Sequence, residues 1–266
     1  MNSLEYKILD LLEDMKKNYG VVNLKAEFEA EGVRIDELMR FKEIADRAGL
    51  GIVLKIGGAE AITDMFAAQR IGVSGLVAPM IESPYALQKY LKAIENYFPS
   101  DSRSDIRFIA MIETTQGHKN VDAILAADKN NLLSTISVGR VDLSGSLALG
   151  RYDINIDRMY TIVEEIFTKA KKIGKGTVMG GGIAKEAIPF IKKLVAKKLL
   201  DRYETRKIVF ATEANATANK MEEGIIKANL FELFWLQNKK KYYTNIYLED
   251  DSRIEMLMSR IYKINP

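Results

Sequence analysis

The sequence predicts an α/β fold, a (β/α)8 TIM-type barrel, and two observations carry this prediction. Short apolar segments alternate regularly with amphipathic, helix-like segments between residues 20 and 215, a pattern typical of a parallel sheet covered by helices. Two of the apolar segments run into a carboxylate, Glu113 and Asp142, and small polar residues follow each one. In a parallel barrel the carboxyl ends of the strands meet at one face, where active sites are built.

The predicted elements follow one another as such a barrel requires. Residues 1–19 form a first helix, because apolar side chains recur there at helical spacing. Apolar and polar residues then alternate over 22–29, which predicts a first strand whose regularity within the barrel stays open. Further strands are predicted at 52–56, 76–81, 108–112, 136–138, 177–180 and 208–211, and helices at 33–48, 59–71, 84–97, 118–127, 155–173 and 184–199. Seven strand signals are visible, so the eighth strand is unidentified and a doubly wound open sheet is the alternative.

The alternation ends near residue 215, and residues 216–266 are predicted to form a helical extension. Apolar spacing predicts one helix over 221–236 and another over 249–264, with the basic-aromatic run at 239–243 as a break between them. The barrel therefore spans 20–215, and the extra C-terminal helices pack on it or on a neighbouring subunit. On this ground we expect a homo-oligomer.

The composition is that of an ordinary globular protein and excludes several function classes. The chain has 266 residues, 47% of them hydrophobic, and a formal net charge of +3, a balance that argues against a nucleic-acid binder. The absence of cysteine excludes zinc–thiolate sites, iron–sulfur clusters and thiol nucleophiles. The first ten residues lack the features of a signal peptide, and no apolar run reaches the ~20 residues that cross a membrane. We expect a cytoplasmic protein without membrane or nucleic-acid partners.

Strand alternation places several charged side chains inside the predicted barrel. The inward residues would be, strand by strand, Lys25, Glu27 and Glu29; Lys55; Arg107, Ile109, Met111 and Glu113; and Val138, Arg140 and Asp142. Unpaired buried charge costs several kcal/mol, so these residues form either an ion-pair network or an active site. We favour the active site at the strand ends, where Lys55, Glu113 and Asp142 lie. Two carboxylates completed by water suit a hard divalent cation.

Four sequence motifs make the chain recognisable. They are Val77-Ala78-Pro79-Met80-Ile81-Glu82-Ser83, Met111-Ile112-Glu113-Thr114, Asn120-Val121-Asp122-Ala123-Ile124-Leu125 and Val138-Gly139-Arg140-Val141-Asp142-Leu143-Ser144-Gly145-Ser146-Leu147. In order and spacing they resemble the HpcH/HpaI aldolase and citrate lyase β-subunit family, over roughly residues 50–215. The resemblance implies a phosphoenolpyruvate/pyruvate-type barrel that makes or breaks a carbon–carbon bond beside a 2-oxo acid or an acyl thioester.

The resemblance also implies a cofactor and residue roles. Glu113 and Asp142 would bind a divalent metal, Mg²⁺, Mn²⁺ or Co²⁺, which chelates the carboxylate and carbonyl of a pyruvate-like substrate. The backbone of Gly139, Val141 and Asp142 would help to hold the substrate carboxylate. A cation at the carbonyl oxygen stabilises the enolate charge that forms when the carbon–carbon bond breaks.

Other residues near the strand ends are candidates by position. The glycine run around Gly181 precedes a helix and can present backbone N–H groups to an anion, so Gly181 is a candidate substrate contact. Arg206 and Lys207 are expected at the start of the last strand, away from the active face. Glu213 and Asn215 are expected at its end, on the active face.

Two features depart from the pattern of the family. Lys55 stands where family members usually place an arginine, and lysine supplies charge without the two-pronged geometry of arginine. The loop after the first strand lacks the histidine that commonly serves as base, and the chain's single histidine, His118, begins a later helix. Glu29 or Glu31 would then take the proton. Lys55, Glu29, Glu31 and Arg140 are therefore the candidate catalytic residues.

Three functional hypotheses follow. The leading one is a divalent-metal-dependent carbon–carbon lyase acting on a 2-oxo acid or an acyl-CoA-type substrate. The second is a non-catalytic or accessory barrel that binds metal and 2-oxo acid without turnover. The third is phosphoenolpyruvate-linked chemistry in the synthesis of sugars or surface polysaccharides.

Overall fold

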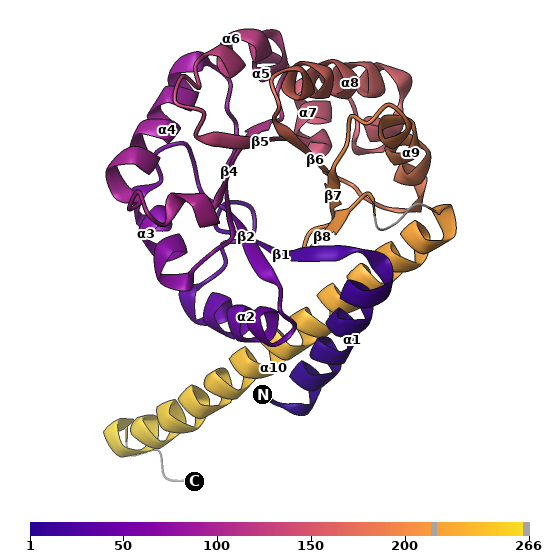
Figure 1. The fold of residues 1–266 in the computed structure, drawn as a ribbon. Helices are drawn as coiled ribbons and strands as arrows, with labels where there is room; N and C mark the ends of the chain where they lie inside the picture. Colours follow the sequence, from indigo (N-terminus) through magenta and orange to yellow (C-terminus); the bar gives the residue numbers. More distant parts are fainter. Residues whose placement is uncertain (214–216, 263–266) are drawn as a thin grey trace.

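The computed structural model describes residues 1–213 and 217–262, and it shows a closed eight-stranded barrel surrounded by helices (Figure 1). The strands are β1 (Val21–Glu27), β2 (Gly51–Lys55), β3 (Gly75–Ala78), β4 (Arg107–Ile112), β5 (Leu133–Gly139), β6 (Gly176–Gly180), β7 (Arg202–Glu204) and β8 (Ile208–Ala211), and they lie in the barrel in sequence order. This confirms the predicted barrel and excludes the open doubly wound sheet.

Helices connect most of the strands and cover the outside of the barrel (Figure 1). The α-helices are α1 (Ser3–Tyr19), α2 (Ile35–Arg47), α3 (Ile62–Ile71), α4 (Pro84–Tyr97), α5 (Thr115–Lys119), α6 (Val121–Ala126), α7 (Arg140–Ser146), α8 (Asp157–Lys172), α9 (Ile188–Ala196) and α10 (Ala218–Tyr262), with 3-10 turns η1 (Arg103–Asp105), η2 (Arg151–Asn155) and η3 (Lys185–Ala187). Local sequence explains several ends. Asn2 and Glu5 form a capping box before α1, and Gly20 ends that helix at a φ of 68°, where a side chain would be strained.

The last two strands form a hairpin that the sequence pattern did not reveal. The eighth strand is β7, only three residues long, too short to show an apolar period. Strand β8 pairs antiparallel with both β7 and β1, whereas β1 to β7 are parallel to one another. The barrel is therefore mixed, and its main irregularity lies at β8. Its pairing with the first strand also shifts register between Val21 and Asn23.

The reversal of β8 corrects the expected positions of four residues. Arg206 and Lys207 lie in the β7–β8 turn, at the same barrel end as Glu31, and both form ion pairs with it. They are therefore at the active face, not away from it. Glu213 follows the C-terminal end of β8 and so lies toward the opposite end. Asn215 lies outside the described residues.

The described part of the C-terminal extension is a single 45-residue helix, α10, where two helices were predicted. The run at 239–243 does not break it, because lysine and tyrosine both fit a helix interior and no proline or glycine follows Gly224 within it. Instead Lys239 and Tyr243 both bind Glu37 on α2, with 3.0 Å between Lys239 Nζ and the carboxylate. Among the described residues, no helix is apolar enough over a sufficient length to cross a membrane.

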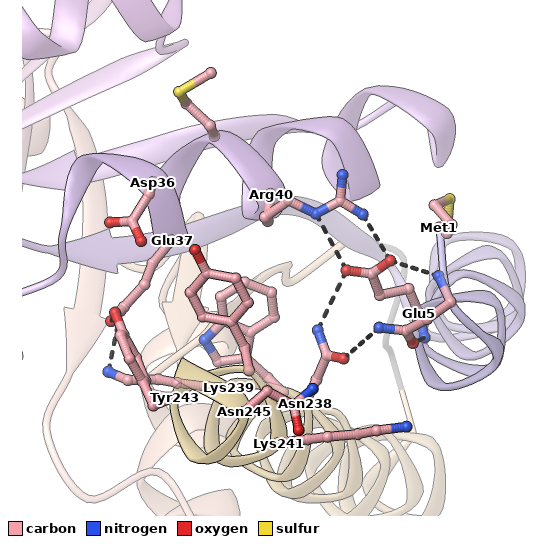
Figure 2. A pocket seen from close by; sticks show the side chains of 14 residues that line it. Met1, Glu5, Asp36, Glu37, Arg40, Asn238, Lys239, Lys241, Tyr243 and Asn245 are labelled. Atoms are coloured by element: carbon pink, nitrogen blue, oxygen red, sulfur yellow. Dashed lines mark hydrogen bonds and ion pairs between the residues drawn. The ribbon is translucent and has the colours of Figure 1, made fainter. Parts of the chain in front are cut away.

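Helix α10 is held against α1 and α2 around a pocket of about 710 Å³ (Figure 2). The polar groups of this pocket bind one another: Arg40 Nη2 lies 2.6 Å from Glu5 Oε2, and Asn238 Nδ2 donates to Glu5 at 3.2 Å. Apolar anchors lie alongside, since the ring of Phe41 contacts those of Phe231 and Trp235 edge-on. The C-terminal end of α10 projects past the barrel (Figure 1).

Two separate apolar clusters divide the core. The larger one lies between the sheet and the helices, and the smaller one fills the middle of the barrel with Val53, Val77, Ile109, Met111 and Val209. The inward positions of Ile109 and Met111 are those that strand alternation predicted. The small interior cluster leaves both ends of the barrel to polar and charged side chains.

A buried network of charged side chains connects β1 and β7, the two strands that flank β8, inside the barrel. Lys25 Nζ on β1 lies 2.9 Å from Glu27 Oε1 and 2.6 Å from Glu204 Oε1 on β7. All three side chains are nearly inaccessible to water. Burial alone would lower the pKa of Lys25, but the two carboxylates raise it overall, so the lysine stays charged. Charges buried in this way are tolerated because each has a partner.

Removing Lys25 should destabilise the fold far more than removing an exposed lysine. Lys25→Met leaves two buried carboxylates without a partner, and we expect a loss of about 3–5 kcal/mol in the free energy of unfolding by urea. Lys89→Met, which removes the exposed Lys89–Glu60 pair, should change the free energy of unfolding very little, because water screens the attraction between two exposed charges. Equal losses in the two variants would contradict the role given to the network.

Candidate active site

The carboxyl ends of β1, β2 and β4 bring three charged side chains together at one mouth of the barrel. Lys55, the last residue of β2, lies with its Nζ 2.9 Å from Glu29 Oε2 and 3.5 Å from Glu113 Oε1. The side chain of Lys55 is 6% exposed, that of Glu113 only 1% and that of Glu29 29%. The lysine thus bridges a carboxylate in the interior and one at the rim.

Glu113 is held by the backbone and leaves one oxygen free of hydrogen bonds. The Met80 N–H donates to Glu113 Oε1 at 3.1 Å, from a residue whose φ of 51° is unusual for a side chain that is not glycine. Within the described structure, the buried Oε2 accepts no hydrogen bond. Gly139 makes room for this oxygen, because a Cβ at that position would lie 2.4 Å from it.

The pKa of Glu113 follows from this environment. The pKa of the Glu113 carboxyl is raised to about 7, mainly by burial and to a smaller extent by the charges of Asp142 and Glu29, while Lys55 and the Met80 N–H oppose the rise. Burial would lower the pKa of Lys55, but Glu113 and Glu29 raise it overall. Lys55 therefore offsets only part of the negative charge of Glu113. A bound cation, as a second positive charge, would stabilise the ionised carboxylate further.

The donor set fits a hard divalent cation that keeps open coordination positions. Asp142 is exposed in the first turn of α7, close enough for its charge to act on Glu113. Together with the unpartnered Glu113 Oε2, it offers carboxylate oxygens, the ligands that such cations prefer. Among the described residues, no cluster of three or more acidic, histidine or cysteine side chains has a metal-binding arrangement. Water or substrate oxygens would therefore complete the coordination.

Arg140 has a different surrounding from the one predicted. Strand β5 ends at Gly139 and Arg140 begins α7, so strand alternation does not extend to Arg140 or Asp142. The inward residues of β5 are Ser137 and Gly139, and Val138 belongs to the outer core. The Arg140 guanidinium is fully buried and donates to the backbone, including Gly181 O at 2.7 Å, and to Asn155 Oδ1 at 2.7 Å. It holds the glycine loop rather than facing Lys55.

Gly181 and Val141 lie where that glycine loop meets the start of α7. Gly181 has a φ of 81°, and a Cβ there would lie 2.6 Å from the Arg140 nitrogen and 2.7 Å from the Val141 nitrogen. A side chain would block the first N–H groups of α7, which have no partner within the helix. Glycine therefore allows the loop to approach the start of α7 this closely.

Two further residues considered in the sequence are engaged elsewhere. Glu31 is bound by both Arg206 and Lys207 at the rim. His118 Nε2 lies 2.9 Å from Glu165 on α8, outside the barrel mouth. Of the two candidate bases, the structure therefore brings Glu29 to Lys55, while Glu31 is occupied by two cations.

Sequence reasoning missed two groups of the barrel, one at this mouth and one deeper in the interior. The first is the Met80 backbone N–H, whose orientation depends on the turn after β3. The second is Ser137 on β5, whose buried hydroxyl has no hydrogen-bond partner within the described structure. Side chains of a strand alternate between its two faces, so an assignment that starts at Gly139, the last residue of β5, places Ser137 inside the barrel. Counting from Asp142, which lies in α7, assigned Val138 to the inward face instead.

Comparisons with known proteins agree with this architecture. The model of the HpcH/HpaI aldolase/citrate lyase family matches residues 44–182, which include β2 to β6 and the whole Lys55–Glu113–Asp142 region. No curated protein sequence matches the chain.

Several solved structures resemble the chain in fold. Citrate synthase SbnG has 18% identity and a TM-score of 0.62, with 88% of this chain and 90% of that one covered. An HpcH/HpaI aldolase/citrate lyase family protein from Burkholderia cenocepacia has 15% identity and a TM-score of 0.60, covering 91% and 90%. The HpcH/HpaI aldolase from Desulfitobacterium hafniense has 14% identity and a TM-score of 0.57, covering 73% and 88%. At such identities the likeness concerns the fold.

The buried Glu113 should give the stability of the protein a distinctive pH dependence. Its pKa is raised in the folded state to about 7 from an ordinary 4.5, so folding favours the protonated form. The stability associated with this group is present below pH 4.5 and is lost as pH rises toward 7.

Glu113→Gln removes this titration. We expect the free energy of unfolding of the variant, relative to the original protein, to be greater at pH 8 than at pH 5 by on the order of 2–3 kcal/mol. Urea titrations at both pH values, in buffer with a chelator, measure the difference. A difference that is the same at the two pH values would show that Glu113 titrates normally.

Proposed function

Because the chain belongs to the HpcH/HpaI aldolase/citrate lyase family, we propose that it is a divalent-metal-dependent carbon–carbon lyase acting on a 2-oxo acid or an acyl-CoA-type thioester. The observation that carries the proposal is Glu113 Oε2, a buried carboxylate oxygen without a hydrogen-bond partner in the described structure, beside the exposed Asp142. These two residues would hold the cation. When bound, Mg²⁺, Mn²⁺ or Co²⁺ would offset the negative charge that develops on the substrate carbonyl oxygen during cleavage.

The residues of the chain have separate roles in this proposal. Lys55 supplies a fixed positive charge at the mouth and orients the negatively charged substrate, since its ammonium lies between Glu29 and Glu113. The backbone of Gly139, Val141 and Asp142, where β5 passes into α7, binds the substrate carboxylate next to the Gly181 loop. Arg140 is a positioning residue, because its donors hold the glycine loop.

Proton transfer is assigned to Glu29. Its carboxylate is partly exposed at the rim and lies 2.9 Å from Lys55 Nζ, so it can reach a substrate hydroxyl above the barrel. Glu31 is less suited to this role, because two cations already bind it. In retro-aldol cleavage, Glu29 would accept the proton of the substrate hydroxyl while the carbon–carbon bond breaks, and electrons pass to the carbonyl of the 2-oxo acid.

The activity test measures the release of pyruvate or oxaloacetate from a panel of 4-hydroxy-2-oxo acids and citrate-like thioesters. Protein stripped with a chelator should be inactive and should regain activity with Mg²⁺, Mn²⁺ or Co²⁺. Glu113→Gln and Asp142→Asn should each weaken metal binding and activity at least about 100-fold. Asp10→Asn, at an exposed residue of α1, serves as the matched control and should change neither.

Two outcomes would contradict the proposal in different ways. Unchanged metal affinity in both site variants would refute the assigned ligands. Binding of pyruvate or oxalate by calorimetry, with no turnover of any substrate in the panel, would identify an accessory binding protein instead of an enzyme.

Lys55 should determine both rate and substrate preference. Lys55→Met is expected to lower kcat/KM about 10²-fold, because a positive charge near the developing negative charge is lost. Lys55→Arg keeps the charge but binds carboxylates in two-pronged geometry, so we expect it to retain more activity with a changed KM. Lys89→Met is the control. Full activity of Lys55→Met would exclude Lys55 from catalysis.

A further inference from the structure

Two arginine side chains lie inside the opposite mouth of the barrel, at the amino ends of the parallel strands. Arg107 begins β4, and its Nη2 donates to Asn23 Oδ1 on β1 at 2.6 Å. Because β2 and β3 lie between β4 and β1 in the barrel wall, the Arg107 side chain must cross the interior. Arg202 begins β7 and shares a strand face with Glu204, which binds Lys25 inside the barrel. Arg202 is therefore also directed inward.

Neither arginine is neutralised by a carboxylate. In residues 1–213 and 217–262, no acidic side chain forms an ion pair with Arg107 or Arg202. The neighbouring Asp201 is occupied by Lys171, at 2.5 Å, and by the Thr177 N–H, at 2.8 Å. In the same described part of the chain, the buried Arg107 Nε–H has no acceptor.

The two guanidinium groups also repel each other. Burial, and after it the charge of Arg202, together lower the pKa of Arg107 to about 10. Burial lowers the pKa of Arg202 as well, in spite of Asp201. A partly buried pair of like charges without a counter-ion is costly. Elsewhere inside the barrel, the same chain supplies carboxylates for Lys25 and Lys55, so this mouth is exceptional.

Small residues surround the two arginines. The inward positions beside them on β2, β3 and β6 are Gly51, Gly75 and Gly176. A Cβ at Gly51 would lie 2.2 Å from Ser74 Oγ, and one at Gly176 would lie 3.0 Å from Thr135 Oγ1. Because these positions are glycines, the large polar side chains of this layer are Arg107, Arg202 and Asn23.

We propose that this mouth binds a doubly charged tetrahedral oxyanion, inorganic phosphate or the phosphoryl group of a small metabolite, between Arg107 and Arg202. A dianion matches the two positive charges, and each guanidinium can donate two parallel hydrogen bonds to phosphate oxygens. The free Arg107 Nε–H supplies one such donor. The site is separate from the mouth that holds Lys55 and Glu113, and it does not depend on the proposed lyase activity.

The test is calorimetric titration of the full chain at constant ionic strength with inorganic phosphate, glycerol 3-phosphate and malonate. If inorganic phosphate and glycerol 3-phosphate both bind, the result supports a site that accepts phosphorylated metabolites. If only inorganic phosphate binds, the result supports a site for the free ion. Binding of malonate as tightly as phosphate would overturn the assignment to a phosphate-class anion, and so would the absence of binding by both phosphates.

Variants distinguish specific phosphate binding at Arg107 and Arg202 from a nonspecific attraction of anions to a positively charged protein. Arg202→Met and Arg107→Met should each weaken phosphate binding at least tenfold, and Arg202→Lys should weaken it less. Arg206→Met is the matched control, because Arg206 lies on the same hairpin at the other mouth and is paired with Glu31. It should bind phosphate as the original protein does.

Thermal unfolding gives a second readout. Without phosphate, Arg202→Met should melt no lower than the original protein, since it removes one of two repelling charges. Phosphate should raise the melting temperature of the original protein and of Arg206→Met, but not that of Arg202→Met. An equal phosphate-induced rise in all three proteins would overturn the proposal, as would a ligand-free Arg202→Met that melts well below the original protein.

Discussion

Charge buried inside the barrel is the constraint on which the rest of the structure depends. A lysine charge removed from water is costly unless a carboxylate pairs with it. Lys25 is paired with Glu27 of its own strand and with Glu204 of β7, and Lys55 is paired with Glu29 and Glu113. The pairing requires that β1, β2 and β7 turn these side chains toward the interior of the barrel. It also leaves Glu113 with one oxygen that no hydrogen bond satisfies in the described structure, and the proposed cation site rests on that oxygen.

The antiparallel direction of β8 determines which cations bind Glu31 and Glu29 at the active mouth. Because β8 runs antiparallel to its neighbours, the β7–β8 turn brings Arg206 and Lys207 to the rim, where they bind Glu31. A parallel eighth strand would have carried them to the other end. Glu31 is thereby held in place, and Glu29 is the rim carboxylate that meets Lys55. The same hairpin carries Arg202 into the opposite mouth, so one short element contributes charge to both ends.

Much of the fold and part of the site could be predicted from the sequence. The alternation of strands and helices in the sequence identified the barrel. Side-chain alternation identified the inward face of β4, because a longer, regular strand shows in its sequence which side chains are buried. It failed at β7, which is too short to show a period, and at β8, whose direction depends on pairing with β1 and β7. Counting back from Asp142 gave Val138 and Arg140 the wrong face, because the chain turns helical at Arg140. The Met80 N–H, a backbone group in an unusual conformation, carries no side-chain signal at all.

The central claim is that the carboxylate of Glu113 accepts a divalent cation, and proton release on metal binding tests it most directly. With a pKa of about 7, Glu113 is mostly protonated at pH 6 and mostly ionised at pH 8. Calorimetry of Mn²⁺ binding in buffers of different ionisation enthalpy should show release of about 0.9 proton at pH 6 and about 0.1 at pH 8, and Glu113→Gln should abolish the difference. Equal proton release at both pH values, with unchanged Mn²⁺ affinity in Glu113→Gln, would contradict the claim.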